Sequence, residues 1–363
     1  MHKDVIIVGA GISGIAAGYN LKKSCQNKTF SILEGRSAIG GTWDLFKYPG
    51  VRSDSDMHTL GYRFKPWIHD KSIADGPSIL EYINETIDEN KLRDDILLNH
   101  KVKSANWDSS KAIWELQIQE KDQLKHMTCG FLFLCGGYYS YTKPHMPSFN
   151  NQEKFSGQII HPQFWTDKVN YEDKKVAVIG SGATAITIVP AIAEKAKHVV
   201  MIQRSPTYVV SGPSEDVVNK FLRKFLPTRI TYFLIRWKNI LWQSFTFSLA
   251  RRYPDRTKNK ILELIKNELG KEYDVDKHFT PAYKPWDQRI CLVPDNDLFE
   301  SIKNNKASVV TEEINEFESN GILLKSGEKV EADIIITATG IELNSLNDID
   351  ITVDNVRINP HQR

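Results

Sequence analysis

The chain has 363 residues, which at about 150 residues per domain corresponds to two or three domains. Its composition, 41% hydrophobic and 25% charged, is that of a globular protein and excludes a collagen-like, disordered or disulfide-stapled chain. The net charge of +2 provides no overall attraction for nucleic acid. The four cysteines form neither a CxxC pair nor a zinc-like spacing, so we expect reduced thiols, no metal site and a cytoplasmic protein.

The first predicted unit is a strand, a glycine-rich turn and a helix. A β-branched run at residues 4–8 predicts a strand buried on both faces, and residues 15–21 predict a helix. The turn between them contains the candidate cofactor-binding residues Gly9, Gly11, Ser13 and Gly14. Glycines in such a turn let the backbone approach a pyrophosphate, which then lies at the N-terminus of the helix.

The next predicted strand, residues 29–34, ends in an acidic residue. Glu34 follows Gly14 by 20 residues, and a carboxylate at this place accepts hydrogen bonds from ribose hydroxyls and repels a 2′-phosphate. A later apolar strand at 131–134 runs into the small residues 135–137, where the backbone can approach a flat cofactor. The first unit therefore predicts a dinucleotide with an unphosphorylated ribose.

The same pattern recurs 171 residues later with a basic residue in place of the acid. Strands are predicted at 175–179 and 198–203, with a helix from 186 to 193. Its turn contains Gly180, Ser181, Gly182, Ala183, Thr184 and Ala185. The second strand ends in Arg204 and Ser205, which suit a 2′-phosphate, so this unit predicts NADP.

A basic, aromatic segment follows the second unit. Residues 220–260 contain eleven Lys and Arg and one acid, Asp255. An apolar stripe at three- and four-residue steps predicts a helix; its members are Ile230, Phe233, Leu234, Trp237, Leu241, Phe245 and Leu249. Two interpretations remain open: a cationic face in weak peripheral contact with a membrane, or, more commonly, a lid helix whose stripe packs on the core.

Together these units predict an α/β protein with two Rossmann-like dinucleotide-binding domains, one for FAD and one for NADPH, and hydride transfer between the cofactors. Disulfide reductases and flavin monooxygenases both fit this pairing. The reductases need a redox-active cysteine pair beside the flavin, whereas no cysteine lies between Cys25 and Cys129. Oxygen chemistry is favoured; the structural alternative is two glycine-rich turns that bind nothing.

Two further motifs resemble those of class B flavoprotein monooxygenases of the type I Baeyer–Villiger group. Residues 155–165, FSGQIIHPQFW, match that group's FxGxxxHxxxW fingerprint, although Thr166 replaces the usual Pro or Asp that follows. The run GGTW at 40–43 and the run YPGVRSD at 48–54 match its second signature. The likeness is greatest to the ethionamide-activating and long-chain alkane- or ketone-oxidising members.

The resemblance implies roles for individual residues. The implied flavin contacts are Gly41, Thr42, Trp43, Asp44 and Leu45, with Val102 at the adenine and Arg52, Ser53 and Asp54 between flavin and nicotinamide. Arg289 matches the catalytic arginine, and Asp54 would hold it in place. The implied reaction inserts one oxygen atom from O2 next to the carbonyl of a small lipophilic ketone, or oxidises a thioether, through a C4a-peroxyflavin.

Two alternatives to this activity stay open. One is a flavin monooxygenase that only hydroxylates nitrogen or sulfur, against which Trp165 and Arg289 argue. The other is an inactive nucleotide-binding remnant, because relatives continue beyond the position of Arg363 and the chain resembles a C-terminally truncated member with exposed apolar surface on its first domain.

The expected domains are 1–146 for FAD, 147–211 with 290–340 for NADP, a helical insertion at 212–289, and 341–363 returning to the FAD domain.

Overall fold

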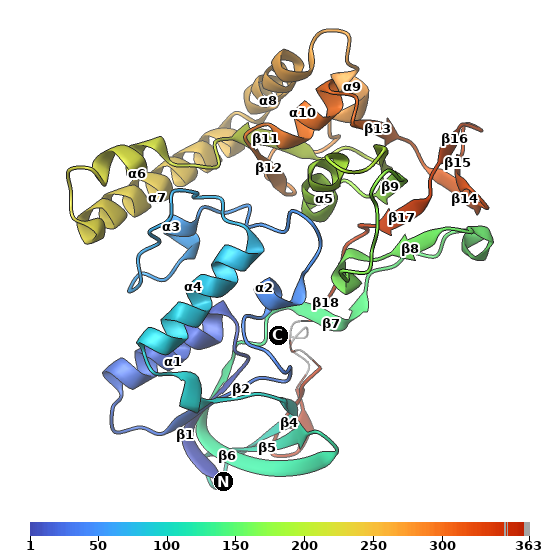
Figure 1. Ribbon diagram of the computed structural model, residues 1–363. Coiled ribbons are helices and arrows are strands. Elements are labelled where there is room, and N and C mark those ends of the chain that lie inside the picture. Colours follow the sequence, from blue (N-terminus) through green and yellow to red (C-terminus); the bar gives the residue numbers. More distant parts are fainter. Residues whose placement is uncertain (345, 347, 359–363) are drawn as a thin grey trace. The chain divides into compact units, whose positions relative to one another are not determined.

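The computed structural model describes residues 1–344, 346 and 348–358, and its contacts divide the chain into two compact units (Figure 1). The first unit comprises Met1–Leu45, Gly76–Lys143 and Ile341–Arg363, and the second comprises Phe46–Asp75 and Pro144–Gly340. Each unit contains a parallel βαβ arrangement, which confirms the predicted α/β class with Rossmann-like nucleotide-binding folds. Segment 46–75 lies in the second unit, although it follows the first βαβ element in sequence.

The first unit is built on an eight-stranded sheet with the order β20-β19-β4-β5-β6-β1-β2-β3. Its strands are β1 (His2–Val8), β2 (Phe30–Leu33), β3 (Ile96–Leu97), β4 (His100–Asp108), β5 (Ile113–Glu120), β6 (Gln123–Leu134), β19 (Asp350–Val353) and β20 (Val356–Arg357). Strand β1 pairs in parallel with β2 and β6, so the carboxyl ends of these three strands meet at one edge. That edge is where a dinucleotide binds in such folds.

Helices cover this sheet with their apolar sides. The helical elements of the unit are α1 (Ile12–Ser24), α2 (Thr42–Leu45), α4 (Gly76–Glu89) and the 3-10 helix η1 (Arg93–Asp95). In α4 the buried Ile79, Ile83 and Ile87 recur every four residues and therefore share one face. The short strands β7 (Tyr139–Pro144) and β18 (Ile341–Leu343) pair beside them.

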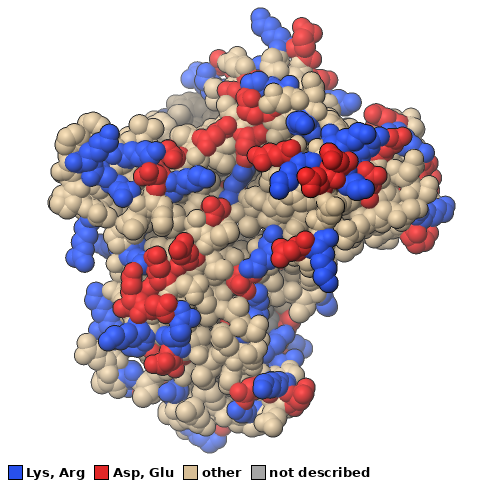
Figure 2. Space-filling model, in the orientation of Figure 1, with Lys and Arg blue, Asp and Glu red and all other residues tan. Residues whose placement is uncertain are grey.

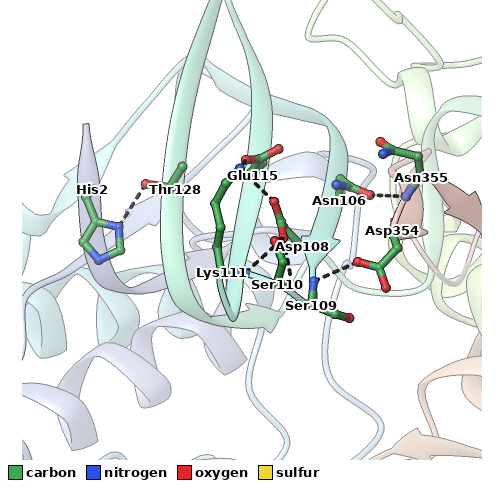
Figure 3. Close-up of polar contacts among 10 residues, drawn as sticks. All are labelled: His2, Asn106, Asp108, Ser109, Ser110, Lys111, Glu115, Thr128, Asp354 and Asn355. Carbon is green, nitrogen blue, oxygen red and sulfur yellow. Dashed lines mark hydrogen bonds and ion pairs between the residues drawn. The ribbon is translucent and has the colours of Figure 1, made fainter.

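Polar contacts between the β4–β5 hairpin and the turn after β19 hold the last strands to the sheet (Figure 3). The amide of Asn355 donates to Asn106 Oδ1 at 2.9 Å, and the amide of Ser109 donates to Asp354 Oδ1 at 2.8 Å. The parallel pairing of β19 with β4 adds backbone bonds along the same edge. Residues from two ends of the sequence therefore form one continuous sheet.

The second unit contains a five-stranded parallel sheet with the order β13-β10-β9-β17-β8. Its strands are β8 (Gln158–Ile160), β9 (Lys175–Ile179), β10 (His198–Gln203), β13 (Ala307–Thr311) and β17 (Ile334–Thr337). Two smaller sheets consist of β11 (Tyr208–Gly212) with β12 (Ile290–Pro294), and of β14 (Ile314–Glu318), β15 (Gly321–Leu324) and β16 (Lys329–Glu331). The near-continuous burial of β9, β10 and β17 explains their Val- and Ile-rich sequences.

The helices of the second unit surround this core. They are α3 (Met57–Leu60), α5 (Ala183–Ala193), α6 (Val217–Leu222), α7 (Thr228–Arg252), α8 (Pro254–Leu269), α9 (Val275–His278) and α10 (Asp297–Lys303), with 3-10 helices η2 (Gln152–Lys154) and η3 (Pro162–Phe164). Within the described part of the chain, no helix combines the length and the apolar character that crossing a bilayer requires.

Helix α7 packs in the opposite orientation to the lid-helix interpretation, which is therefore wrong. The apolar stripe expected on the core is exposed, with Leu241 63% and Phe245 58% accessible. The face that packs is polar: Arg236 donates to the carbonyls of His58, Thr59 and Gly61, so the end of α3 binds this helix through a guanidinium. Arg236 can donate to these carbonyls only when the polar face of α7 lies inward, so the apolar stripe lies outward.

Candidate functional site

A groove in the first unit gathers most of the residues predicted to bind the first nucleotide. It has an empty volume of about 700 Å³, part of it open to solvent, at the carboxyl ends of β1, β2 and β6. Its lining includes the predicted Gly9, Gly11, Ser13, Glu34, Gly41, Thr42, Trp43 and Val102, together with the small residues Cys135, Gly136 and Gly137. Of the remaining predicted contacts in this unit, Gly14 is buried beneath the turn, and Asp44 and Leu45 do not line the groove.

The glycine at the third position of this turn is required by close packing. A Cβ atom on Gly14 would lie 1.8 Å from the carbonyl oxygen of Gly9. Helix α1 can therefore begin directly beneath the turn only because this side chain is absent. Ile12 and Ser13, in the first turn of this helix, line the groove, and the N-terminus of a helix is a suitable site for phosphate.

Glu34 is held at the end of β2 by backbone donors. The carboxylate is buried, and its two oxygens accept from the amides of Ala10 and Arg36, each at 2.9 Å. Each carboxylate oxygen has a further lone pair for a hydroxyl donor in the groove that Glu34 lines. The predicted acid therefore lies in the groove with its carboxylate oriented by two backbone donors.

Two contributors to this groove were not found from the sequence. Arg36 pairs with Asp44 at 2.5 Å and donates to the carbonyl of Gly41 at 3.3 Å, so it fixes the loop before α2. Tyr141 lies on the groove wall with the Arg36 guanidinium 5.8 Å from its ring centroid. The only sequence signal for Tyr141 was its position shortly after the small-residue run at 135–137.

The second unit has its own groove, with an empty volume of about 1380 Å³ that includes open solvent. Its lining includes the predicted Gly180, Ser181, Gly182, Arg204 and Ser205, together with the small residues Ala338, Thr339 and Gly340. Gly180 has a φ of +135°, and a Cβ there would lie 2.3 Å from the carbonyl oxygen of Ala338. The predicted Ala183, Thr184 and Ala185 begin α5 beneath this turn and do not line the groove.

Arg204 shares this groove with two acidic residues. Glu312 and Glu313 follow β13, the strand next to β10, and line the groove with Arg204 and Ser205. An ion pair with Lys325 lowers the pKa of Glu313, and the positive charge of Arg204 lowers it further. Sequence reasoning missed both acids, because nothing in the chain order shows that β13 pairs with β10.

A third cluster in the second unit contains Arg289 and Asp54. Their side chains form an ion pair across 235 positions of sequence, as the expectation that Asp54 holds this arginine requires. The guanidinium is 59% exposed, so it keeps surface available for a further partner. The buried Cys291 follows on β12, and burial raises the pKa of its thiol to about 11, which keeps it protonated at neutral pH.

Two contacts that were not predicted position the loop carrying Asp54. Tyr48 is hydrogen-bonded with Thr184 at the start of α5, and burial raises the pKa of its phenol. Arg52 forms an ion pair with Asp297 at the start of α10, and burial raises the pKa of that carboxyl despite the guanidinium beside it. Arg52, Ser53 and Asp54 line neither groove, so their cofactor roles stay predictions.

His161, the histidine of the fingerprint run, has a structural position. Its Nδ1 accepts from the amide of Gln163 at 3.2 Å, and its Nε2 lies 3.1 Å from the carbonyl oxygen of Gly340. Since Nδ1 accepts, the ring proton is on Nε2 and donates to Gly340. Burial lowers the pKa of this imidazole, which favours the neutral ring. It connects β8 to the small-residue turn after β17.

Comparison with known proteins places the chain in a family. The profile described as flavin-binding monooxygenase-like matches residues 64–357, and one described as an NAD(P)-binding Rossmann-like domain matches residues 7–69. The chain belongs to the flavin-binding monooxygenase-like family. The predicted resemblance to flavoprotein monooxygenases is thereby confirmed.

Relatives within this family share nearly half of their residues with the chain. It is 49% identical over 358 residues to the FAD-containing monooxygenase EthA of Mycobacterium tuberculosis, a match that covers 98% of this chain and 73% of EthA. It is 47% identical over 361 residues to the probable FAD-binding monooxygenase AlmA of an Acinetobacter species, covering 99% of this chain and 72% of AlmA. The sequence likeness extends over both units.

Solved structures of the same fold are more distant in sequence. A steroid monooxygenase bound to NADP superposes with a TM-score of 0.80 at 24% identity, covering 97% of this chain and 74% of that one. A cyclohexanone monooxygenase superposes with a TM-score of 0.83 at 20% identity, covering 99% and 78% of the two chains. At these identities the likeness establishes the fold.

Proposed function

We propose that this protein is a FAD- and NADPH-dependent monooxygenase of the Baeyer–Villiger type. One observation carries the proposal: two grooves of the same βαβ construction have a buried carboxylate, Glu34, in one and a guanidinium, Arg204, in the other. These groups select ribose hydroxyls and a ribose phosphate respectively. Relatives named as FAD-containing monooxygenases and a structural neighbour described as bound to NADP support the same pairing.

The donor set of the first groove fits FAD. Its glycine turn brings the N-terminus of α1 to the groove, where it would bind a pyrophosphate, and Glu34 would accept hydrogen bonds from the adenosine ribose. Val102, a buried apolar residue on the groove wall, would contact the adenine. Thr42 and Trp43, at the start of α2, would lie beside the ribityl chain and the flavin ring.

The second groove fits NADPH in the same manner. The turn at Gly180 and Gly182 and the start of α5 would hold the pyrophosphate, and Arg204 with Ser205 would hold the 2′-phosphate. Ser181 is held in place because its hydroxyl donates to the carbonyl of Ser205 at 3.0 Å. This hydrogen bond therefore connects the segments that follow β9 and β10 at the groove.

Bound FAD, once reduced by NADPH, would activate O2 and supply the oxygen atom that enters the substrate. Within this chain, Arg289 would donate hydrogen bonds to the negative charge that develops on the carbonyl oxygen of the substrate. A guanidinium carries a delocalised positive charge on planar donors, and Asp54 restricts the orientation of this one through their ion pair. A positioned donor of this kind is worth about 3–4 kcal/mol of barrier.

The substrates that fit this proposal are O2 and small lipophilic ketones or thioethers. A nucleophilic attack on a carbonyl requires the positive charge of Arg289, whereas oxygen transfer to a soft sulfur does not require it. Segment 220–260 would be the part of the enzyme in contact with a membrane from which lipophilic substrates partition. The two classes of substrate therefore distinguish the role of Arg289 from that of the cofactors.

The test compares Arg289→Ala with the unaltered protein, after each has been purified and its bound flavin measured by visible absorption. The expected result is a loss of at least about 100-fold in ketone oxidation, with NADPH oxidation and FAD content retained. Arg251→Ala, which also breaks an exposed ion pair with an aspartate, is the matched control and is expected to leave ketone oxidation intact. Unchanged ketone oxidation in Arg289→Ala would reject the mechanism.

Two results would favour the alternatives. A yellow protein that oxidises thioethers and amines but no ketone supports a flavin monooxygenase restricted to nitrogen and sulfur. A colourless protein that takes up no added FAD supports a nucleotide-binding remnant without turnover.

A further inference from the structure

Helix α7 has two opposite faces with unrelated roles. Its residues rotate by about 100° each, so Tyr232 and Ile235, which are buried, lie on the side opposite Trp237 and Leu241. The outward face is apolar as far as Phe245, and its exposed members are Ile230, Phe233, Leu234, Trp237, Leu241 and Phe245. The exposed Trp242 and Leu249 lie at its margin. An apolar surface of this extent on the outside of a unit is typical of an interaction site.

The orientation of α7 is determined by polar contacts on its inner face. The Tyr232 hydroxyl donates to the carbonyl of Tyr62 at 3.0 Å, and the amides of Asn239 and Gln243 donate to the two carboxylate oxygens of Asp56 at 2.8 and 2.7 Å. With the donation of Arg236 to the end of α3, these bonds hold about three turns of the helix, from Tyr232 to Gln243. Rotating the helix to bury its aromatic face would leave Asp56 and these donors without partners, which is costly in a buried site.

The charge beside this apolar face is positive. Most cations of segment 220–260 pair with acids or donate to carbonyls, but Lys224, Arg229, Arg252 and Arg256 have no acidic partner among the described residues. Arg252 and Arg256 instead lie over the ring of Tyr253. Arg229 lies at the beginning of α7, and Arg252 lies at its end. Figure 2 shows Lys and Arg side chains predominating over the tip formed by α6 and α7, interleaved with uncharged residues.

We propose that the outward face of α7, together with α6, docks on an anionic lipid surface. The helix would lie parallel to the membrane plane, with its Trp and Phe side chains in the headgroup region and the unpaired cations at the lipid phosphates. Exposed Phe221 and Phe225 of the α6 segment extend the same apolar surface. A second copy of this chain is a poorer occupant, because a symmetric contact would bring the unpaired cations of two identical tips together.

This inference rests on the proposed function in one respect. Lipophilic ketones and thioethers partition into bilayers, so an enzyme that oxidises them meets a higher substrate concentration when it is bound to the membrane surface. The docking face contains none of the residues that line the two nucleotide grooves. Lipid binding and oxygenation can therefore be measured, and can fail, independently.

The experiment measures co-sedimentation of the full chain with vesicles of phosphatidylcholine containing about one third phosphatidylglycerol, and with pure phosphatidylcholine vesicles. We expect binding to the anionic vesicles at low salt, weaker binding to the neutral ones, and a marked loss at about 1 M salt, where charges are screened beyond about 3 Å. An absence of binding to anionic vesicles at low salt would overturn the proposal.

Two variants locate the contact. Trp237→Ser with Phe245→Ser removes part of the apolar face and should weaken binding at least about tenfold, and Lys224→Gln with Arg229→Gln should weaken it about fivefold for each charge. The matched controls are Phe131→Ser, an exposed aromatic of β6, and Lys168→Gln with Lys271→Gln, which should bind as the unaltered chain does. Equal losses in variants and controls would refute the assignment of the face.

Further measurements separate other occupants and the enzymatic proposal. If sedimentation equilibrium shows a dimer that the Trp237→Ser, Phe245→Ser variant dissociates, and neither form binds vesicles, the occupant is a second copy and the lipid proposal is wrong. Oxidation of a short, water-soluble ketone should be the same in this variant and in the unaltered chain. If no form of the protein oxidises any ketone or thioether but vesicles are still bound, the proposed function fails while the docking surface stands.

Discussion

Replacement of Arg204 tests the nucleotide assignment most directly. In the second groove Arg204 is the cation at the end of β10, and a charge-assisted hydrogen bond of the kind it would make is worth about 1.5–3 kcal/mol. That range corresponds to a factor of about 10–150 in kcat/KM. The side chain is exposed, so solvent screening places the expected loss for Arg204→Ala toward the lower end, at about 10–30-fold.

The neighbouring acids make this prediction specific to the groove. Without Arg204, Lys325 is the cation that still opposes the negative charge of Glu313, and this charge repels a 2′-phosphate more strongly. Arg204→Ala with Glu313→Gln should therefore recover part of the loss, and Glu313→Gln alone should lower the KM for NADPH. Neither change should affect turnover with NADH, which carries no phosphate at this position.

The assay is steady-state oxidation of NADPH and of NADH, with FAD content equalised among the proteins. Lys197→Ala, an exposed cation just before β10, serves as the matched control and should leave both coenzymes unaffected. Equal losses for NADPH and NADH in Arg204→Ala would refute the phosphate assignment. No recovery in the double variant would show that Glu313 does not face the coenzyme.

Three further predictions concern the first groove and stability. Gly14→Ala should yield a protein without the visible absorption of flavin, because its Cβ would lie 1.8 Å from the Gly9 carbonyl oxygen, whereas Gly182→Ala, with no atom within 4 Å, should stay yellow. Asp297→Ala should lower the free energy of unfolding in urea by about 3 kcal/mol by leaving Arg52 unpaired, and Arg52→Met added to it should restore part of the loss. Burial lowers the pKa of His58, whose charged neighbours are Asp56, Asp216, Lys238 and Arg223. The contribution of the neutral ring to the free energy of unfolding should therefore be complete above pH of about 6.5, and it should fall on acidification by up to about 1.4 kcal/mol per pH unit. His58→Leu should flatten this slope, and an unchanged slope would contradict the assignment.

The sequence was sufficient for the two nucleotide units because their signals are local. A buried strand, a glycine turn and a helix follow one another within about 20 residues, and each step has its own backbone requirement. The predicted strands 175–179 and 198–203 coincide with β9 and β10. The groups at the strand ends, Glu34 and Arg204, lie in the grooves because the carboxyl ends of parallel strands meet at one edge.

Non-local pairing decided the remainder. Glu313 reaches the Arg204 groove only because β13 pairs with β10, and Asp297 meets Arg52 only because segment 46–75 packs in the second unit. Such contacts depend on which distant segments pack together, and the spacing of residues along the sequence does not indicate which segments these are. The partner of Arg289, by contrast, could be predicted, since a family signature named both residues.

In helix α7 the sequence predicted the helix itself, but tertiary contacts decided which of its faces is buried. Its three- and four-residue apolar periodicity predicted a helix, because periodicity follows from the rotation per residue. Which face turns inward depended on what the neighbouring segment presented, and the free carbonyls at the end of α3 and the carboxylate of Asp56 required donors. The sequence by itself determined the elements and the charge at their ends; the tertiary structure decided which faces are buried, because a buried polar group must find its partner wherever the chain supplies one.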